Sequence, residues 1–150
     1  MIVNRRTLII IHFFDTRRSP RVVRTFDVLP GSEHTLKASG RDMTAVKAIL
    51  VVSAVCTSKP EPNFRAQVKE AGEAIGPMFG DRDGLIVKHL LCSRWGDKNV
   101  GGGLYFFESI ENVESYLSSE FWEGVLKDTE WDTDTLKYEL YRVGDVPLVA

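Results

Sequence analysis

The chain has 150 residues, of which 43% are hydrophobic and 27% charged, and its formal net charge is -2. This length suits one domain, because folding can bury about 68–70% of the surface of an extended chain of that size. No apolar run approaches the ~20 residues of a membrane span, so we expect no membrane partner. Residues 43–150 carry 17 acidic against 11 basic side chains, which also disfavours nucleic acid as a partner.

Residues 1–43 differ in composition from the rest and read as an appendage. Residues 1–26 hold six arginines and one acid, Asp15, a composition typical of a mitochondrial transit peptide. A disordered extension, a spurious start upstream of Met43, and an added strand are the alternatives. The two cysteines, Cys56 and Cys92, lie in apolar runs and predict reduced thiols in a cytoplasmic protein.

Regular patterning begins at Val46 with a strand and a helix. Residues 46–56 (VKAILVVSAVC) are rich in β-branched side chains, and both alternating sets are mainly apolar, so both faces of this strand should be covered. Residues 63–79 (NFRAQVKEAGEAIGPMF) predict an amphipathic helix that Gly76 and Pro77 disrupt near its end. Its apolar stripe consists of Phe64, Val68, Ala71, Ile75 and Met78.

A second round of strands and a helix follows. Residues 85–95 (LIVKHLLCSRW) and 100–108 (VGGGLYFFE) predict two strands joined by a hairpin-like GDKN connection. Ser109 is the expected cap of a second helix, with Glu111 in its first turn. The apolar face of that helix consists of Ile110, Val113, Leu117 and Phe121.

The chain ends with a predicted linker, 127–134 (KDTEWDTD), and a last strand, 135–143 (TLKYELYRV). The complete order predicts an α+β domain over residues 44–150, a ferredoxin-like βαββαβ arrangement with both helices on one face of an antiparallel sheet. The other face would then be apolar and open to water. A second copy is the simplest cover, so we expect a homodimer that encloses an apolar cavity for a small molecule.

Several runs in residues 46–150 resemble one known family. The segment GGGLYFFESIENVESYL, the helix FRAQVKEAGEAIG and the closing ELYRVGDVPL are similar to the YdhR-type monooxygenases, a family of the dimeric α+β barrel superfamily. The matching residues are Gly102, Gly103, Tyr105, Phe107, Tyr116, Leu117, Val143, Pro147 and Leu148. The strand at 85–95 departs from the family, because Lys88-His89 and Leu-Leu-Cys stand where a more aromatic strand is typical.

This resemblance implies an enzyme of secondary metabolism that oxidises an electron-rich quinol or anthrone with dioxygen and needs no cofactor. Members of the superfamily also catalyse other reactions, so the fold does not fix the function. The alternatives are a cofactor-free decarboxylase, dehydratase or cyclase of a biosynthetic pathway, and an accessory protein that binds a small molecule without turnover.

Three polar residues are candidates for chemistry on the strand at 85–95. His89 is the only histidine of the predicted domain and the first candidate base, although a core or surface histidine is the simpler explanation. Lys88 points to the opposite face, where its ammonium could stabilise an enolate or phenolate; the alternative is an exposed lysine. Arg94 shares the face of Lys88 and could act at the cavity mouth or be solvated.

Aromatic residues are the candidates for the cavity wall. Tyr105 and Phe107 share one face of their strand, and Tyr138 lies in the last strand. Tyr105 is the candidate catalytic phenol, but core packing explains either aromatic set equally well. Trp95, Trp122 and Trp131 lie near element ends, where an aromatic can wall a pocket or close an interface, and interface packing is the simpler explanation.

Several motifs of known enzyme classes are absent from the sequence. The chain has no Walker loop, HExxH, CxxC or nucleophile elbow, so hydrolytic, phosphoryl-transfer and simple zinc chemistry lack support. The triple glycine 101–103 leads into a strand, whereas a dinucleotide-binding loop leads into a helix. A bulge, or a close approach of the backbone to a ligand, is the expected role of these glycines.

Overall fold

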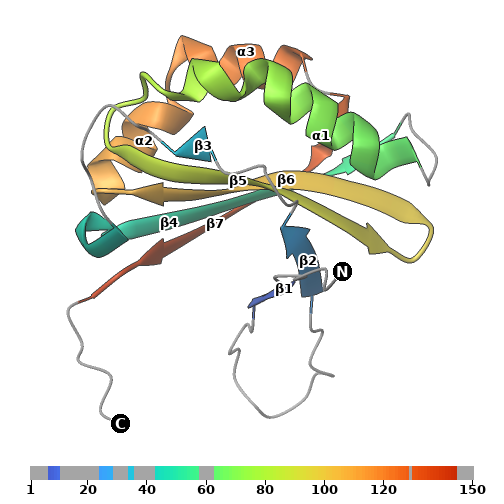
Figure 1. Cartoon of the computed structure of the whole chain (residues 1–150), viewed down its shortest axis with the longest axis horizontal. Coiled ribbons are helices and arrows are strands. Elements are labelled where there is room, and N and C mark those ends of the chain that lie inside the picture. The colour runs from blue at the N-terminus through green and yellow to red at the C-terminus, as the bar shows by residue number, and fades with distance from the viewer. Residues whose placement is uncertain are drawn as a thin grey trace, which may run out of the picture.

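This computed structural model describes residues 7–10, 24–28, 34–35, 43–57, 63–128 and 130–144. They form a mixed α+β fold in which helices cover one face of an antiparallel sheet (Figure 1). The four long strands lie in the order β5, β6, β4, β7. Their bounds are Leu85–Trp95 (β5), Lys98–Phe107 (β6), Ala48–Cys56 (β4) and Trp131–Arg142 (β7).

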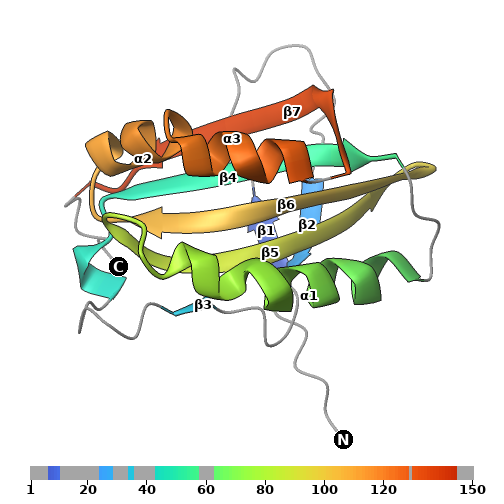
Figure 2. The same ribbon diagram turned by 90° about the horizontal axis from the view of Figure 1, so that it is seen from above.

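The helices divide into two groups above the sheet. Figure 2 shows α1 running along the β5 side, with α2 and α3 over the β4 and β7 side. The bounds are Asn63–Ile75 (α1), Ile110–Leu117 (α2) and Glu120–Asp128 (α3), with short 3₁₀ turns at Met43–Ala45 (η1) and Gly76–Phe79 (η2). None of the helices described is long and apolar enough to cross a membrane.

The described parts of the first 43 residues form three short strands. They are Thr7–Ile10 (β1), Arg24–Val28 (β2) and His34–Thr35 (β3). Strands β2 and β3 pair with β5, and β1 pairs with β2 on the side of the sheet opposite the helices (Figure 1). The expected transit peptide or disordered extension concerns residues that lie mostly outside the described ranges and stays a prediction.

The main strands and the first helix confirm the predicted elements. Residues 76–79 form a 3₁₀ turn with Pro77 near its start, where the helix was expected to be disrupted. Strands β4 and β6 differ from the predicted bounds by two residues at most at either end. The apolar character of both sheet faces is confirmed, because β4 alternates between two buried clusters.

Two expectations for the C-terminal third are wrong. The helix predicted to carry both Ile110 and Phe121 is two helices, because the Ser118 and Ser119 hydroxyls donate hydrogen bonds to backbone carbonyls at the end of α2. Ser119 then accepts the Trp122 N–H at 3.2 Å and opens α3. The predicted linker 127–134 is also wrong, since α3 runs to Asp128 and β7 begins at Trp131.

The described core has a large cluster beneath the helices, a small one between α1 and β5 that contains Phe64, and a third on the opposite face. The large cluster includes Leu50, Val52, Tyr105 and Phe107 from the sheet. The cluster on the opposite face consists of Val51, Leu91, Val100 and Leu104, all buried within the single chain, with β1 and β2 lying on that side (Figure 1). Cover of this face by a second copy stays a prediction.

Candidate functional site

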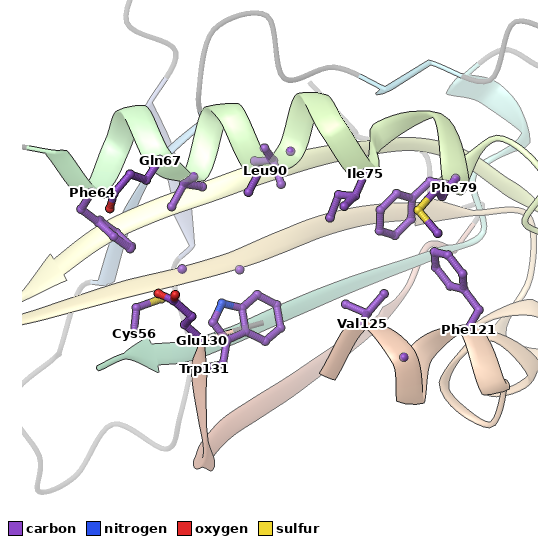
Figure 3. Close-up of a pocket in the computed structure, with 17 residues that line it drawn as sticks. Cys56, Phe64, Gln67, Ile75, Phe79, Leu90, Phe121, Val125, Glu130 and Trp131 are labelled. Atoms are coloured by element: carbon purple, nitrogen blue, oxygen red, sulfur yellow. The ribbon is translucent and has the colours of Figure 1, made fainter. Parts of the chain in front are cut away.

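A pocket of about 430 Å³ lies between α1, α3 and the sheet (Figure 3). Helix α1 and η2 form one wall and α3 the other, while Leu90 of β5 and Gly101 of β6 form part of the floor. Most of the lining is apolar. This volume falls within the range of about 300–1,000 Å³ that is typical of small-molecule sites.

The apolar stripe of the first predicted helix faces this pocket. Its five members, Phe64, Val68, Ala71, Ile75 and Met78, all line the pocket. Phe64 is buried, yet Met78 is 56% exposed and Ala71 is also exposed. The stripe therefore borders a space that the protein's own side chains leave open, which an apolar ligand could fill.

Glycines shape the pocket from three sides. A Cβ on Gly101 would lie 3.1 Å from the Cys56 sulfur and 3.3 Å from Trp131 Nε1, so a larger residue would crowd that end. A Cβ on Gly72 would collide with the Leu90 side chain, whereas one on Gly124 of α3 would meet nothing within 4 Å. The expected bulge at residues 101–103 is wrong, since β6 pairs with β4 there without a register shift. Gly101 and Gly102 do line the pocket, as the close-approach alternative requires.

The few polar groups of the pocket gather toward one end. Figure 3 shows Gln67 of α1 opposite Cys56, Glu130 and Trp131, while Phe79 and Phe121 lie at the far end. The Gln67 Oε1 atom is buried and has no hydrogen-bond partner among the described residues. An unsatisfied acceptor at this position suits a ligand that donates an O–H or N–H group.

Lys88 and His89 lie on opposite faces of β5, as the strand alternation predicts. Lys88 is on the helix side and only 2% exposed, with its Nζ 3.7 Å from the Phe79 ring centroid and 5.5 Å from that of Tyr105. Burial lowers the pKa of Lys88 to about 7. His89 packs edge-on against Phe106, with ring centroids 6.0 Å apart, on the face away from the pocket.

Tyr105 and Phe107 belong to the core beneath the helices. Their rings stack with centroids 6.3 Å apart, and the Tyr116 ring lies 5.4 Å from Tyr105. Burial raises the pKa values of Tyr105 and Tyr116, so both remain phenols at neutral pH. A phenol can donate a hydrogen bond to an anion, but it is a poor base in this state.

The remaining candidates are spread over the molecule. Trp122 is buried and donates from Nε1 to the Tyr138 hydroxyl at 3.1 Å, although Tyr138 is itself 44% exposed. Trp95 packs against the cluster on the face opposite the helices. Arg94 is exposed, and its Nε donates to the Gly96 carbonyl at 3.3 Å.

None of the eight predicted site residues lines the pocket. Lys88 contacts the wall from outside, because the Phe79 ring beneath its Nζ is part of the lining. Sequence reasoning missed Gln67, Cys56 and Glu130 as pocket residues. Of the three tryptophans considered as pocket walls, Trp131 does line the pocket. The helical apolar stripe was the available signal, since a ligand placed against it would also meet these side chains.

The described ranges contain no group of three or more His, Cys, Asp or Glu side chains arranged to hold a metal ion. A comparison with protein-family models finds no match, and neither the curated proteins nor the solved structures include a significant match. The site is therefore interpreted from its own geometry and chemistry.

Proposed function

We propose that this protein is a cofactor-independent monooxygenase that binds an electron-rich aromatic molecule, such as a quinol or anthrone, between α1 and α3. The single observation that carries the proposal is the apolar pocket of about 430 Å³. Its aromatic and aliphatic walls suit a flat ring system, and the polar end at Gln67 suits a hydroxyl group.

The strand order supports the resemblance on which the reaction class rests. The order β5-β6-β4-β7, with the described helices on one face, supports the proposal of a ferredoxin-like domain. We infer a dimeric α+β barrel from it, with the sheet faces opposite the helices meeting across a two-fold axis. Ile49 and Phe106, half-buried on that face, would lie in such an interface.

Lys88 is the base that the geometry favours. His89 lies on the other face of the sheet, and Tyr105 stays protonated. With a pKa of about 7, Lys88 is partly neutral near neutral pH and can accept a proton. The Phe79 ring separates Lys88 from the pocket, so this role requires the ring to turn aside when the substrate enters.

The proposed oxidation by dioxygen accounts for all atoms and electrons without a cofactor. Lys88 takes a proton from the substrate, and the resulting carbanion or enolate gives electrons to dioxygen. The peroxide that forms on the carbon then loses water. One oxygen atom becomes a ketone oxygen, the other leaves as water, and the oxidised CH₂ group supplies both hydrogens. The dry pocket protects the anion from reprotonation by solvent.

Incubation of the purified protein with anthrone tests this function. We expect anthraquinone formation that consumes dioxygen and incorporates one labelled atom from labelled dioxygen. Lys88→Met should lower the rate, after subtraction of the uncatalysed background, by about 10²-fold or more, a loss typical for removal of a general base. Equal product under nitrogen would exclude the oxygenase, and an unlabelled product would favour a cofactor-free decarboxylase, dehydratase or cyclase.

A small-molecule carrier is the second candidate. It is favoured by the absence of all eight predicted site residues from the pocket lining. A carrier would bind aromatic molecules with the same preference, but it would leave anthrone unchanged in air. The Lys88→Met variant would then bind its ligand without altering it, as the wild type does.

A further inference from the structure

Two cations lie directly behind the aromatic end of the pocket. Phe79 and Phe121 both line the pocket and pack edge to face, with their centroids 5.1 Å apart. Lys88 Nζ lies 3.7 Å from the Phe79 centroid, and the Arg82 guanidinium carbon lies 4.2 Å from that of Phe121. Since neither cation lines the pocket, the ring pair stands between the pocket and both positive charges.

Buried hydrogen-bond donors lie in the cluster behind this ring pair. The Arg82 Nε atom is buried and has no hydrogen-bond partner among the described residues. The Tyr116 hydroxyl is also buried, and burial together with the neighbouring Tyr105 hydroxyl raises its pKa. The Tyr116 ring is 6.2 Å from Phe121 and 5.4 Å from Tyr105, so the phenol belongs to the same cluster. Buried donors are normally satisfied, so this cluster suits an acceptor supplied by a ligand.

The backbone holds Arg82 in place before any ligand arrives. Its N–H donates to the Phe79 carbonyl at 3.2 Å, and its own carbonyl accepts the Leu85 N–H at 3.1 Å. The Gly84 carbonyl accepts the Glu108 N–H at 2.9 Å, which ties this turn to the start of α2. The guanidinium and the Tyr116 hydroxyl are therefore presented by elements that are fixed to each other.

We propose that Arg82, Lys88 and Tyr116 form an anion site that receives an acidic oxygen group of the ligand whose aromatic body occupies the pocket. A carboxylate or phenolate suits it, because guanidinium, ammonium and phenol groups all donate to such oxygens. The group enters when the Phe79 ring turns aside. This inference rests on the proposed function only in placing a ligand in the same pocket.

A pair of fluorescent probes that differ by one charge tests the anion site. Anilinonaphthalene sulfonate and N-phenylnaphthylamine share their aromatic body, but only the first carries an anionic group. Titrations compare the wild type with Arg82→Gln, Tyr116→Phe and the control Lys98→Gln. Lys98 is an exposed cation at the hairpin between β5 and β6, at the opposite end of β5 from Arg82.

We expect Arg82→Gln to weaken the sulfonate probe by about tenfold, the loss of one charge-assisted hydrogen bond, and to change the neutral probe by less than about twofold. Tyr116→Phe should weaken the sulfonate selectively as well, and Lys98→Gln should change neither probe. The neutral probe reports whether each variant keeps its pocket. An unchanged sulfonate affinity in Arg82→Gln, or equal losses for both probes, would overturn the anion site alone. If neither probe binds the wild type, both the anion site and the proposed function are contradicted.

Discussion

For Lys88, the sequence predicts the correct face of β5 but not the burial of its side chain. Strand alternation predicts that Lys88 and His89 face opposite sides, and the register confirms it. The burial of its amine was not predictable, because the covering Phe79 ring comes from the 3₁₀ turn η2, earlier in the chain. Where a 3₁₀ turn lies over a sheet depends on tertiary packing, which local patterns do not contain.

The buried amine predicts an unusual dependence of stability on pH. The pKa of Lys88 is about 7 in the folded protein and near 10.5 when unfolded, so the unfolded state binds more protons between these values. The Lys88 contribution to the free energy of unfolding should therefore rise with pH, by about 2 kcal/mol between pH 7 and pH 9.

Urea denaturation of the wild type and of Lys88→Met measures this effect. The free energy of unfolding of the variant should exceed that of the wild type by the largest amount at or below pH 7. This excess should shrink as the pH rises toward 9. A difference that stays constant over this range would show that Lys88 titrates normally.

At the scale of elements, the periodicity of helix α1 predicts which residues form its apolar stripe, but not what the stripe contacts. The stripe from Phe64 to Met78 is identified correctly by its spacing, but the pattern reads equally as core or as pocket wall. Whether the stripe becomes core or pocket wall depends on the distance between α3 and α1. It also depends on glycines, which a hydrophobic pattern does not detect. The break between α2 and α3 was missed because Ser118 and Ser119 act through hydroxyl bonds to the backbone.

Gly124 and Gly72 form a matched pair for testing helix packing. A Cβ on Gly124 meets nothing within 4 Å, so Gly124→Ala should raise the free energy of unfolding by about 0.5–1 kcal/mol through better helix propensity. Gly72→Ala makes the same change in α1, but the new methyl group collides with Leu90 and should destabilise the fold. Urea denaturation of both variants checks this, and equal shifts of the same sign would contradict the packing described.

The start of α2 depends on one side chain. Ser109 Oγ accepts the Asn112 N–H at 3.0 Å, as expected for the residue that caps this helix. Ser109→Ala should lower the free energy of unfolding by about 1 kcal/mol, while Ser109→Asp should retain most of the stability. Thermal unfolding followed by circular dichroism measures both variants, and equal losses in the two would count against a capping role.

For the whole molecule, the predicted order of elements is largely confirmed. Nearly continuous apolar runs bounded by turn signals were enough to predict β4, β5 and β6, because these strands are largely buried on both faces. The early start of β7 was missed since Trp131 and Asp132 lie in an acidic stretch, and their pairing with Cys56 and Val55 is a long-range contact. The position of the pocket was equally beyond local patterns.

The proposed homodimer predicts the mass of the protein in solution. Sedimentation should give a species of about twice 16.9 kDa, since one isologous interface would cover the sheet face opposite the helices. Ile49→Glu places a charge on that face and should yield monomers, whereas Glu111→Gln on the exposed side of α2 should not. A wild type that sediments as a monomer at all concentrations would contradict the dimer.

The most direct test of the account is a binding titration in the pocket between α1 and α3. Gly124→Phe adds a ring from α3 into open space along the pocket, while Glu123→Phe adds the same ring at the neighbouring exposed position. We predict that N-phenylnaphthylamine binds the wild type and Glu123→Phe alike, and that Gly124→Phe weakens it by about tenfold or more. Equal binding to all three folded proteins would contradict the assignment of this pocket as the ligand site.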